Sequence, residues 1–192
     1  MLINNAKKED AKSVAVLHKQ IFSKIHFTTS FSISLLTKYF ENLIEKMKYG
    51  IVIKDNDDCV GYLFATVNIG QIINDFLKAN FLKVFFYLML NPGFIPEKIG
   101  ELFSKFSSKN KNTGNEISLY LIAVDTRLGR RGIGKKLINH FEELVKSNNE
   151  KSYTLFVRKN NLQAIDFYLK NNFIQIETDD KSIKFRKEFT SV

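Results

Sequence analysis

The sequence predicts a single α/β domain with a mixed sheet, and three observations support this. The chain has 192 residues, a length for which one domain is the default. Its apolar content of 44% and charged content of 26% are ordinary for a globular protein. Segments with strand and helix patterns follow one another in the order strand, two helices, three strands, helix, strand, helix, two strands. We therefore treat residues 1–192 as one domain without internal repeats.

The first part of the chain is expected to contain a strand, two helices and a hairpin. Apolar residues recur at helical spacing after Glu9, and Ser32 is a suitable N-cap for the second helix. Two β-rich runs are joined by the acidic turn 55–58, which is a hairpin signal. The expected elements are a strand at 1–4, helices at 9–23 and 33–47, and strands at 49–54 and 59–68.

Residues 71–115 are predicted to be a helical insertion between the third and fourth strands. They comprise a strongly apolar helix at 72–90, a Pro92-Gly93 stop, a second helix at 96–106 and a polar tail. The first helix contains three charged side chains, which are costly in hydrocarbon, so we do not expect it to span a membrane. Its phenylalanines and leucines need a partner, which could be the sheet edge, a substrate cleft or a second copy in a homodimer.

The chain beyond residue 115 is expected to alternate strands and helices. Ile117–Val124 is nearly all apolar and β-prone, which is typical of a central strand. Apolar residues then recur at helical spacing from Leu137 to Val145. The remaining expected elements are a strand at 152–157, a helix at 161–170, and strands at 173–177 and 182–189.

The densest cluster of glycines and basic residues lies between the central strand and the helix that follows it. It consists of Gly129, Arg130, Arg131, Gly132, Gly134, Lys135 and Lys136. A helix start exposes unpaired backbone N–H groups and the positive end of the helix dipole, so it attracts anions. Glycine lets the backbone come close to a ligand, and the basic side chains add charge. We interpret this turn as a cradle for a pyrophosphate group.

The spacing within the cluster excludes two common nucleotide sites. A Rossmann fingerprint needs G-x-G-x-x-G, and no such run occurs in the chain. A Walker A loop needs Ser or Thr directly after its lysine, where this chain has Lys136. Lysine cannot hold Mg²⁺ as a hydroxyl does, so the nucleotide-hydrolase interpretation loses its metal. We expect no metal site, because the three histidines are isolated and Cys59 is the only cysteine.

The same stretch closely resembles motif A of the GNAT (GCN5-related) N-acetyltransferases, [QR]-x-x-G-x-[GA] after a strand ending in Val-Asp. Val124-Asp125 closes the strand, and Gly132 and Gly134 fall on the two glycine positions. The chain departs from the pattern at Gly129, where the family usually has Arg or Gln.

A second segment resembles another signature of this family, N-x-x-A-x-x-x-Y-x-x-x-G-F. Asn161, Ala164, Tyr168 and Phe173 match it. Asn172 replaces the usual Gly, and Asn is the next best residue for a left-handed helix stop. Two motifs in the right order are far more specific than either alone.

The resemblance implies a GNAT fold that binds acetyl-CoA and transfers its acetyl group to an amine in a ternary complex. The fold would have six to seven strands splayed between strands 4 and 5, flanked by about four core helices. Tyr168 would act as general acid toward the leaving thiolate. The implied cofactor-binding residues are Ile122, Ala123, Val124, Leu128, Gly129, Arg130, Arg131, Gly132, Ile133, Gly134, Lys135, Asn161, Ala164 and Tyr168.

The general base and the acceptor site are less constrained by the sequence. Glu116 begins the central strand, and it is a base or a solvated strand end. His26 is the second candidate base, because an imidazole near neutral pKa suits that task. In this family the linker between the first two helices forms a wall of the acceptor site, which would place His26 and Phe27 there. Tyr120 shares a strand face with Glu116 and lines the cleft or fills the core.

The net charge of +9 favours an anionic partner, of which coenzyme A is one. No run of five basic residues and no recognition motif accompanies the charge, so we do not expect nucleic-acid binding. Met1–Asp10 has no apolar signal core, and a single Cys59 excludes an internal disulfide, so a cytoplasmic location is expected.

Two functions therefore compete. The first is an N-acetyltransferase acting on a primary amine of a small molecule; the positive charge favours a nucleotide-linked amino sugar. The second is a non-catalytic module that binds acyl-CoA or a protein partner on the same fold.

Overall fold

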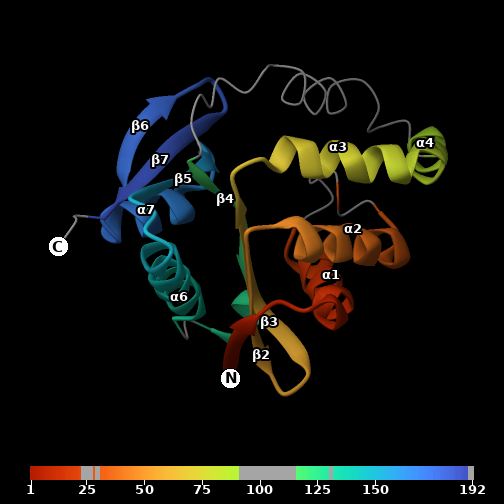
Figure 1. Cartoon of the computed structure of the whole chain (residues 1–192), viewed down its shortest axis with the longest axis horizontal. Coiled ribbons are helices and arrows are strands. Elements are labelled where there is room, and N and C mark those ends of the chain that lie inside the picture. Colours follow the sequence, from red (N-terminus) through yellow and green to blue (C-terminus); the bar gives the residue numbers. More distant parts are fainter. Residues whose placement is uncertain (23–27, 29–30, 91–115, 130–131, 190–192) are drawn as a thin grey trace.

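The computed structural model describes residues 1–22, 28, 31–90, 116–129 and 132–189; for residues 87–90 it describes the backbone alone. Seven strands form one sheet in the order β1-β2-β3-β4-β5-β7-β6 (Figure 1). The strands are β1 Leu2–Asn5, β2 Tyr49–Asp55, β3 Asp58–Thr66, β4 Ile117–Val124, β5 Ser152–Arg158, β6 Ile174–Thr178 and β7 Ser182–Glu188. The helices are α1 Ala11–Ile21, α2 Ile33–Lys46, α3 Ile69–Ala79, α4 Phe81–Leu90, α6 Ile133–Ser147 and α7 Leu162–Lys170.

One strand pair differs from the others in the sheet. The pair β4–β5 is parallel, whereas β1–β2, β2–β3, β3–β4, β5–β7 and β6–β7 are antiparallel. Parallel neighbours need a crossover, and α6 supplies it between β4 and β5. The predicted fold class, a mixed sheet with its parallel pair at strands 4 and 5 and flanking helices, is confirmed.

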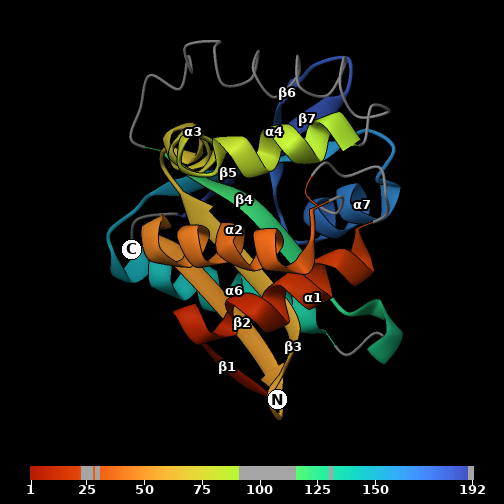
Figure 2. The same ribbon diagram turned by 90° about the vertical axis from the view of Figure 1, so that its right-hand side faces the viewer.

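The helices cover both faces of the sheet, and each face has its own core. On one face α1, α2 and α3 pack on β3 and β4, as Figure 2 shows from that side. On the other face α6 and α7 pack on β4, β5 and β7. Burial on both faces is the physical reason why β3 reads as a near-continuous apolar run.

The turns form where the sequence offers residues suited to them. Asn56, Asn149 and Asn172 adopt positive φ at the β2–β3 turn and after α6 and α7, and Asn tolerates that conformation better than most residues. The predicted boundaries of β4 are those observed, and the other predicted elements outside the insertion shift by only a few residues.

The insertion differs from its prediction in one respect. The expected single helix at 72–90 is two helices, α3 and α4, which separate at Asn80. Asn80 is the C-cap of α3, and its backbone N–H and its side-chain amide both donate to the Phe76 carbonyl at 3.0 Å. Asn side chains bond to nearby backbone groups in this way at helix ends, which is where the two helices separate. The expected helix at 96–106 and the polar tail lie outside the described residues.

Helix α3 is fixed on α2. Phe76 packs against Tyr39 with ring centroids 5.3 Å apart, and Asn42 donates to the Ile72 carbonyl at 3.3 Å. On α4, Val84 is buried, while Phe81, Leu82, Phe85 and Phe86 are exposed. The homodimer predicted through this segment stays a prediction. Within the described part of the chain, no helix combines the length and apolar character needed to cross a membrane.

Candidate active site

The parallel pair β4–β5 opens after three residue pairs. Pairing runs from Ile117 opposite Tyr153 to Leu119 opposite Leu155. At the next residue the β3–β4 register shifts, since Phe64 pairs with Leu121 and the following Ala65 pairs with Leu119. Tyr120 is thus the extra residue of a β-bulge, a feature that bends a strand and increases its twist. The point where β4 and β5 separate, directly after Leu119 and Leu155, is called the fork below. The bulge lies at the fork and explains why β4 leaves β5 there.

Beyond the fork, β4 presents backbone groups toward the side that β5 has left. The Asp125 N–H donates to the Val60 carbonyl on β3 at 2.9 Å. Because consecutive residues of a strand direct their N–H and C=O groups to alternate sides, Val124 and Ile122 point these groups away from β3. Ala123 pairs with Tyr62 and directs its own groups to β3. The fork therefore exposes donors and acceptors from Ile122 and Val124.

The chain then enters the predicted pyrophosphate cradle. A 3₁₀ turn at Thr126–Leu128 leads to Gly129, with φ +75°, and Gly132, with φ +68°, is the residue before α6. A side chain at either glycine would meet no atom within 4 Å, so the space beside both is open. Arg130 and Arg131 lie outside the described residues, and Lys135 is exposed. The positive φ values and the open space are what a backbone cradle requires.

The start of α6 is uncapped. Gly132 has no side chain to accept a hydrogen bond, and only its carbonyl joins the helix, accepting from the Lys136 N–H at 2.9 Å. The first N–H groups of a helix, here those of Ile133, Gly134 and Lys135, have no acceptor within the helix. Together with the helix dipole they form an anion-binding position that fits a diphosphate.

Strand β3 holds this helix start close to the sheet. A Cβ atom at Gly61 would lie 2.8 Å from Ile133 Cγ2 and 3.4 Å from the Ala123 carbonyl oxygen. Glycine at position 61 therefore permits the first turn of α6 to sit directly on β3, beside the end of β4. Sequence reasoning missed this residue, because one glycine in a strand does not show which element approaches it.

Helix α7 carries the second motif, and its conformation explains the motif residues. The Asn161 side chain accepts from the Ala164 N–H at 3.2 Å and caps the helix. At the other end the Phe173 N–H donates to the Tyr168 carbonyl, and the Asn172 N–H donates to the Leu169 carbonyl, both at 3.1 Å. With Asn172 at φ +60°, this is a Schellman motif. Its hydrophobic contact joins Phe173 and Tyr168, whose ring centroids are 5.0 Å apart.

The phenol of Tyr168 lies in an apolar setting. The residue is 5% exposed and packs on Phe173, Phe167 and Phe185. Burial raises the pKa of its hydroxyl well above the usual value, so the phenol stays protonated at neutral pH. Its hydroxyl makes no hydrogen bond with the described part of the chain and keeps a proton to donate.

Glu116 lies at the closed end of the strand pair, just before β4. Its carboxylate accepts from Ser152 Oγ at 3.0 Å and from Arg186 Nε at 3.0 Å. Three residues separate Glu116 from Leu119, which is about 10 Å along an extended strand. Its carboxylate thus links β4 to the first residue of β5 and to β7.

Of the predicted acceptor-site residues, only Tyr120 can be placed. Its hydroxyl lies 3.0 Å from that of Tyr39 on α2. His26 and Phe27 lie outside the described residues. Neither the bulge at Tyr120 nor the contact with Tyr39 has a signal in the sequence, since both depend on tertiary packing.

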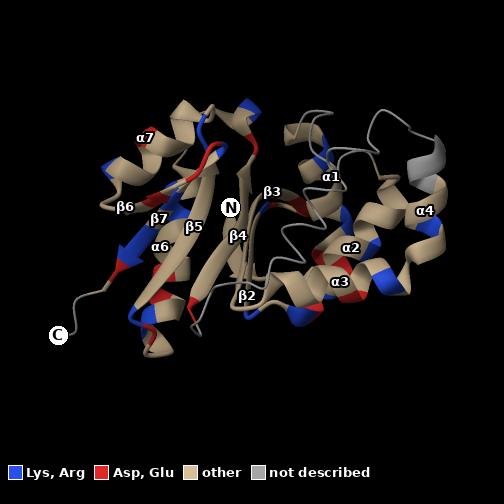
Figure 3. Cartoon of the chain, turned by 90° about the horizontal axis from the view of Figure 1, so that it is seen from above, with Lys and Arg blue, Asp and Glu red and all other residues tan. Residues whose placement is uncertain are grey.

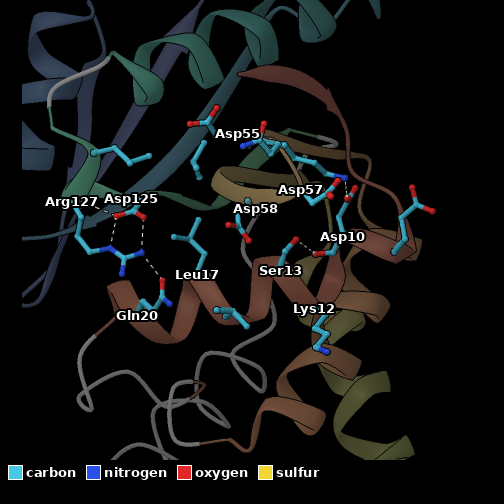
Figure 4. A pocket seen from close by; sticks show the side chains of 17 residues that line it. Asp10, Lys12, Ser13, Leu17, Gln20, Asp55, Asp57, Asp58, Asp125 and Arg127 are labelled. Carbon is cyan, nitrogen blue, oxygen red and sulfur yellow. Dashed lines mark hydrogen bonds and ion pairs between the residues drawn. The ribbon is translucent and has the colours of Figure 1, made fainter.

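A pocket of about 780 Å³ adjoins the cradle on its α1 side. Arg127 closes one end of it: its guanidinium donates to Asp125 Oδ2 at 2.7 Å and to Gln20 Oε1 at 2.8 Å (Figure 4). The lining also includes the carboxylates of Asp10, Asp57 and Asp58 and the ammonium groups of Lys12 and Lys54. The Arg127 contacts connect the end of α1 to the residue that closes β4.

Charged side chains are distributed over the whole molecule. Lys and Arg occur on both sides of the sheet and are interspersed with Asp and Glu (Figure 3). Several are paired, such as Lys8 with Glu45 and Lys46 with Asp75. This distribution gives no single basic stripe among the described elements.

The described part of the chain combines a sheet that opens between two parallel strands with a glycine-lined helix start that has no side-chain cap, and this combination defines a class of α/β fold. A comparison of the sequence with protein families shows which family this fold belongs to. The model of the acetyltransferase (GNAT) family matches residues 17–173, and the chain therefore belongs to that family. No curated protein matches the chain by sequence.

Solved structures show the same fold at low sequence identity. The PaiA N-acetyltransferase from Thermoplasma acidophilum in complex with coenzyme A is 13% identical, with a TM-score of 0.63 and 98% of both chains covered. Naa50 from Arabidopsis thaliana with the bisubstrate analogue CoA-Ac-MVNAL is 16% identical, with a TM-score of 0.59 and 98% of both chains covered. The ribosomal-protein-S18-alanine N-acetyltransferase from Escherichia coli is 14% identical, with a TM-score of 0.57, and the similarity covers 100% of this chain and 95% of that one.

Proposed function

We propose that this protein is an acetyl-CoA-dependent N-acetyltransferase that acetylates a primary amine of a small molecule. The observation that carries the proposal is the open start of α6 beside the forked end of β4. There, uncapped N–H groups and the backbone of Ile122 and Val124 converge. Membership of the acetyltransferase family supports the same conclusion.

The cradle and the fork would hold the acetyl donor in two places. The N–H groups of Gly134 and Lys135 would bind the diphosphate at the helix start. The strand edge at Ile122 and Val124 would bind the pantetheine arm, and Asn161 and Ala164 of α7 would lie along its other side. Bound acetyl-CoA supplies a thioester whose carbonyl carbon an amine can attack.

Two groups of the chain would assist the transfer. The Val124 N–H points away from β3 and would donate to the carbonyl oxygen as negative charge develops on it. As the new C–N bond forms and the C–S bond breaks, the Tyr168 hydroxyl would give its proton to the sulfur. The proton is present at neutral pH because the pKa of a phenol lies well above 7, and burial raises it further.

A base must also take a proton from the attacking amine. We keep Glu116 as the candidate, acting through one or more waters, because it directly precedes β4, the strand that forms the fork. Its contact with Arg186 offers the other role, a link between strands. Replacement of Glu116 by Gln separates the two, because a base affects turnover and a link affects stability.

The acceptor is proposed to be a small amine, and the net charge of +9 favours one that carries phosphate, such as a nucleotide-linked amino sugar. The similar structures include an enzyme named as a ribosomal-protein-S18-alanine N-acetyltransferase and an enzyme in complex with the bisubstrate analogue CoA-Ac-MVNAL, so peptide amines belong in the same test.

Titration calorimetry with acetyl-CoA tests the donor half directly. We expect binding in the micromolar range, and no heat at high micromolar concentration would contradict the proposal. Acetyl-CoA consumption with amino sugars, sugar nucleotides, polyamines, aminoglycosides and peptides tests the acceptor half. Binding without turnover of any amine would favour the non-catalytic acyl-CoA module instead.

A further inference from the structure

The two hydroxyl groups of Tyr39 and Tyr120 form a hydrogen-bonded pair beside the fork. Their oxygen atoms are 3.0 Å apart, a hydrogen-bond distance. Tyr120 is the bulged residue that directly follows Leu119, the last residue of β4 to pair with β5. Burial raises the pKa of both phenols, so both are protonated at neutral pH.

Two neutral hydroxyls that share one hydrogen bond have one proton left over. Within the described part of the chain, neither hydroxyl has a second partner. Tyr39 is 2% exposed and is enclosed by Phe40 and Phe76, each with its ring centroid 5.3 Å away. Tyr120 keeps partial exposure to solvent. A proton left on Tyr39 would be a buried donor without an acceptor, which is costly. The lower-energy arrangement has Tyr39 donating to Tyr120, whose own O–H then points outward.

We infer that Tyr39 is a positioning residue that acts through Tyr120, and that the Tyr120 O–H binds an oxygen next to the amine of the acceptor. The inference rests on the proposed function. It narrows the substrate class to amines with a carbonyl or hydroxyl on the neighbouring carbon, such as amino sugars, amino-acid amides and peptide N-termini. Polyamines lack such a group.

The pair gives the insertion a role in this site. Helix α3 presses Phe76 onto Tyr39, and Tyr39 in turn fixes the hydroxyl of Tyr120. The insertion thereby sets the orientation of a donor at the fork without contacting the acceptor through α3 itself.

Thermal unfolding of three variants tests the direction of the hydrogen bond. Tyr120→Phe leaves the Tyr39 donor buried without an acceptor, and we expect a fall in Tm of about 3 to 8 °C. Tyr39→Phe leaves Tyr120 free to donate outward and should lower Tm much less. The double variant should be more stable than Tyr120→Phe alone. Equal losses for the two single variants, or the reverse order, would overturn the assignment.

Acetylation of two matched amines tests the substrate class. Alaninamide and sec-butylamine have similar size, and only alaninamide has a carbonyl beside the amine. Comparing kcat/KM for the unprotonated amines, we expect a preference for alaninamide that falls about 5- to 10-fold in Tyr120→Phe, which removes the donor. Tyr39→Phe keeps the donor but no longer positions it, so the preference should fall there too, by a smaller factor. Tyr49→Phe is the matched control, because Tyr49 packs on Phe141 at the other face of the sheet, and it should keep the preference.

Calorimetric binding of acetyl-CoA to the same proteins distinguishes failure of the inference about Tyr39 and Tyr120 from failure of the proposed function. If the wild type binds acetyl-CoA but shows no turnover of alaninamide, or if its preference survives in Tyr120→Phe, this inference is wrong and the proposed function stands. If the wild type does not bind acetyl-CoA, the proposed function itself fails.

Discussion

The start of α6 and the start of α7 are built in opposite ways. At α7 the side chain of Asn161 accepts from the Ala164 N–H at 3.2 Å, and Ser32 and Asn68 do the same at α2 and α3. At α6 the corresponding residue is Gly132, which offers no side chain and leaves the N–H groups to an external acceptor. A helix that caps itself gains stability, and a helix that does not is available to a ligand.

The comparison also shows why glycine suits this position. Gly132 has φ +68°, a conformation that most residues other than Gly and Asn adopt only with strain, and a Cβ there would meet nothing within 4 Å. The start of α6 lacks the stabilisation of a side-chain cap, while the capped helices α2, α3 and α7 stabilise the fold around it. The difference predicts distinct effects for substitutions at the two helix starts.

The largest effect is expected at the open start. Gly132→Asp puts a negative charge where we place the diphosphate, and acetyl-CoA affinity should fall about 100-fold, because close like charges repel by several kcal/mol. Gly132→Asn is the matched control, since it has the same shape and tolerates positive φ without the charge. Titration calorimetry gives the acetyl-CoA dissociation constant of each variant. Equal affinities for the two variants would show that no anion binds at α6.

A large effect on turnover is expected from α7, where Tyr168 lies. Tyr168→Phe should lower kcat about 10- to 100-fold, because the leaving sulfur loses its proton donor. Acetyl-CoA affinity and Tm should change little, since the hydroxyl has no partner in the described part of the chain. Steady-state kinetics with the best amine substrate provide the measurement. Wild-type kcat in this variant would remove Tyr168 from the chemistry.

A moderate effect on stability is expected at the capped start. Asn161→Ala removes the cap and should cost about 1 kcal/mol, or about 2 to 4 °C in Tm. Asn161→Ser keeps a capping hydroxyl and should recover most of that loss. Acetyl-CoA affinity should fall far less than in Gly132→Asp. A comparable fall in both would mean that the two helix starts bind the cofactor alike.

The smallest effect concerns the pair that joins the cradle to α1. Arg127 lowers the pKa of Asp125, so the folded state favours the carboxylate. This contribution is present above the unfolded pKa, about 4, and is lost as pH falls through the lower folded value. Arg127→Gln should therefore be slightly less stable than the wild type at pH 7. The difference should shrink below about pH 4, and Tm measured from pH 7 to pH 3 follows it. A Tm difference between the two proteins that grows as pH falls would show that the Arg127–Asp125 ion pair does not stabilise the fold.

Local signals were sufficient for most elements of the fold. The apolar run at 117–124, the helical spacing from Leu137 to Val145 and the Asn residues at turns predicted elements that the structure confirms. The two motifs correspond to local structural features of the chain. One is an uncapped helix start, and the other is a Schellman stop that holds Tyr168 against Phe173. The break at Asn80 was missed, because the apolar spacing continues through it.

The sequence by itself determined the elements, their order and the two motifs, because hydrophobic period, capping and turn preference act over a few residues. Only the tertiary structure decided where β4 leaves β5, which residue bulges there and which hydroxyl Tyr120 meets. Those features depend on register between strands and on contacts such as Gly61 with Ile133 and Phe76 with Tyr39. Residues far apart in the chain leave no periodic trace of such contacts in one sequence.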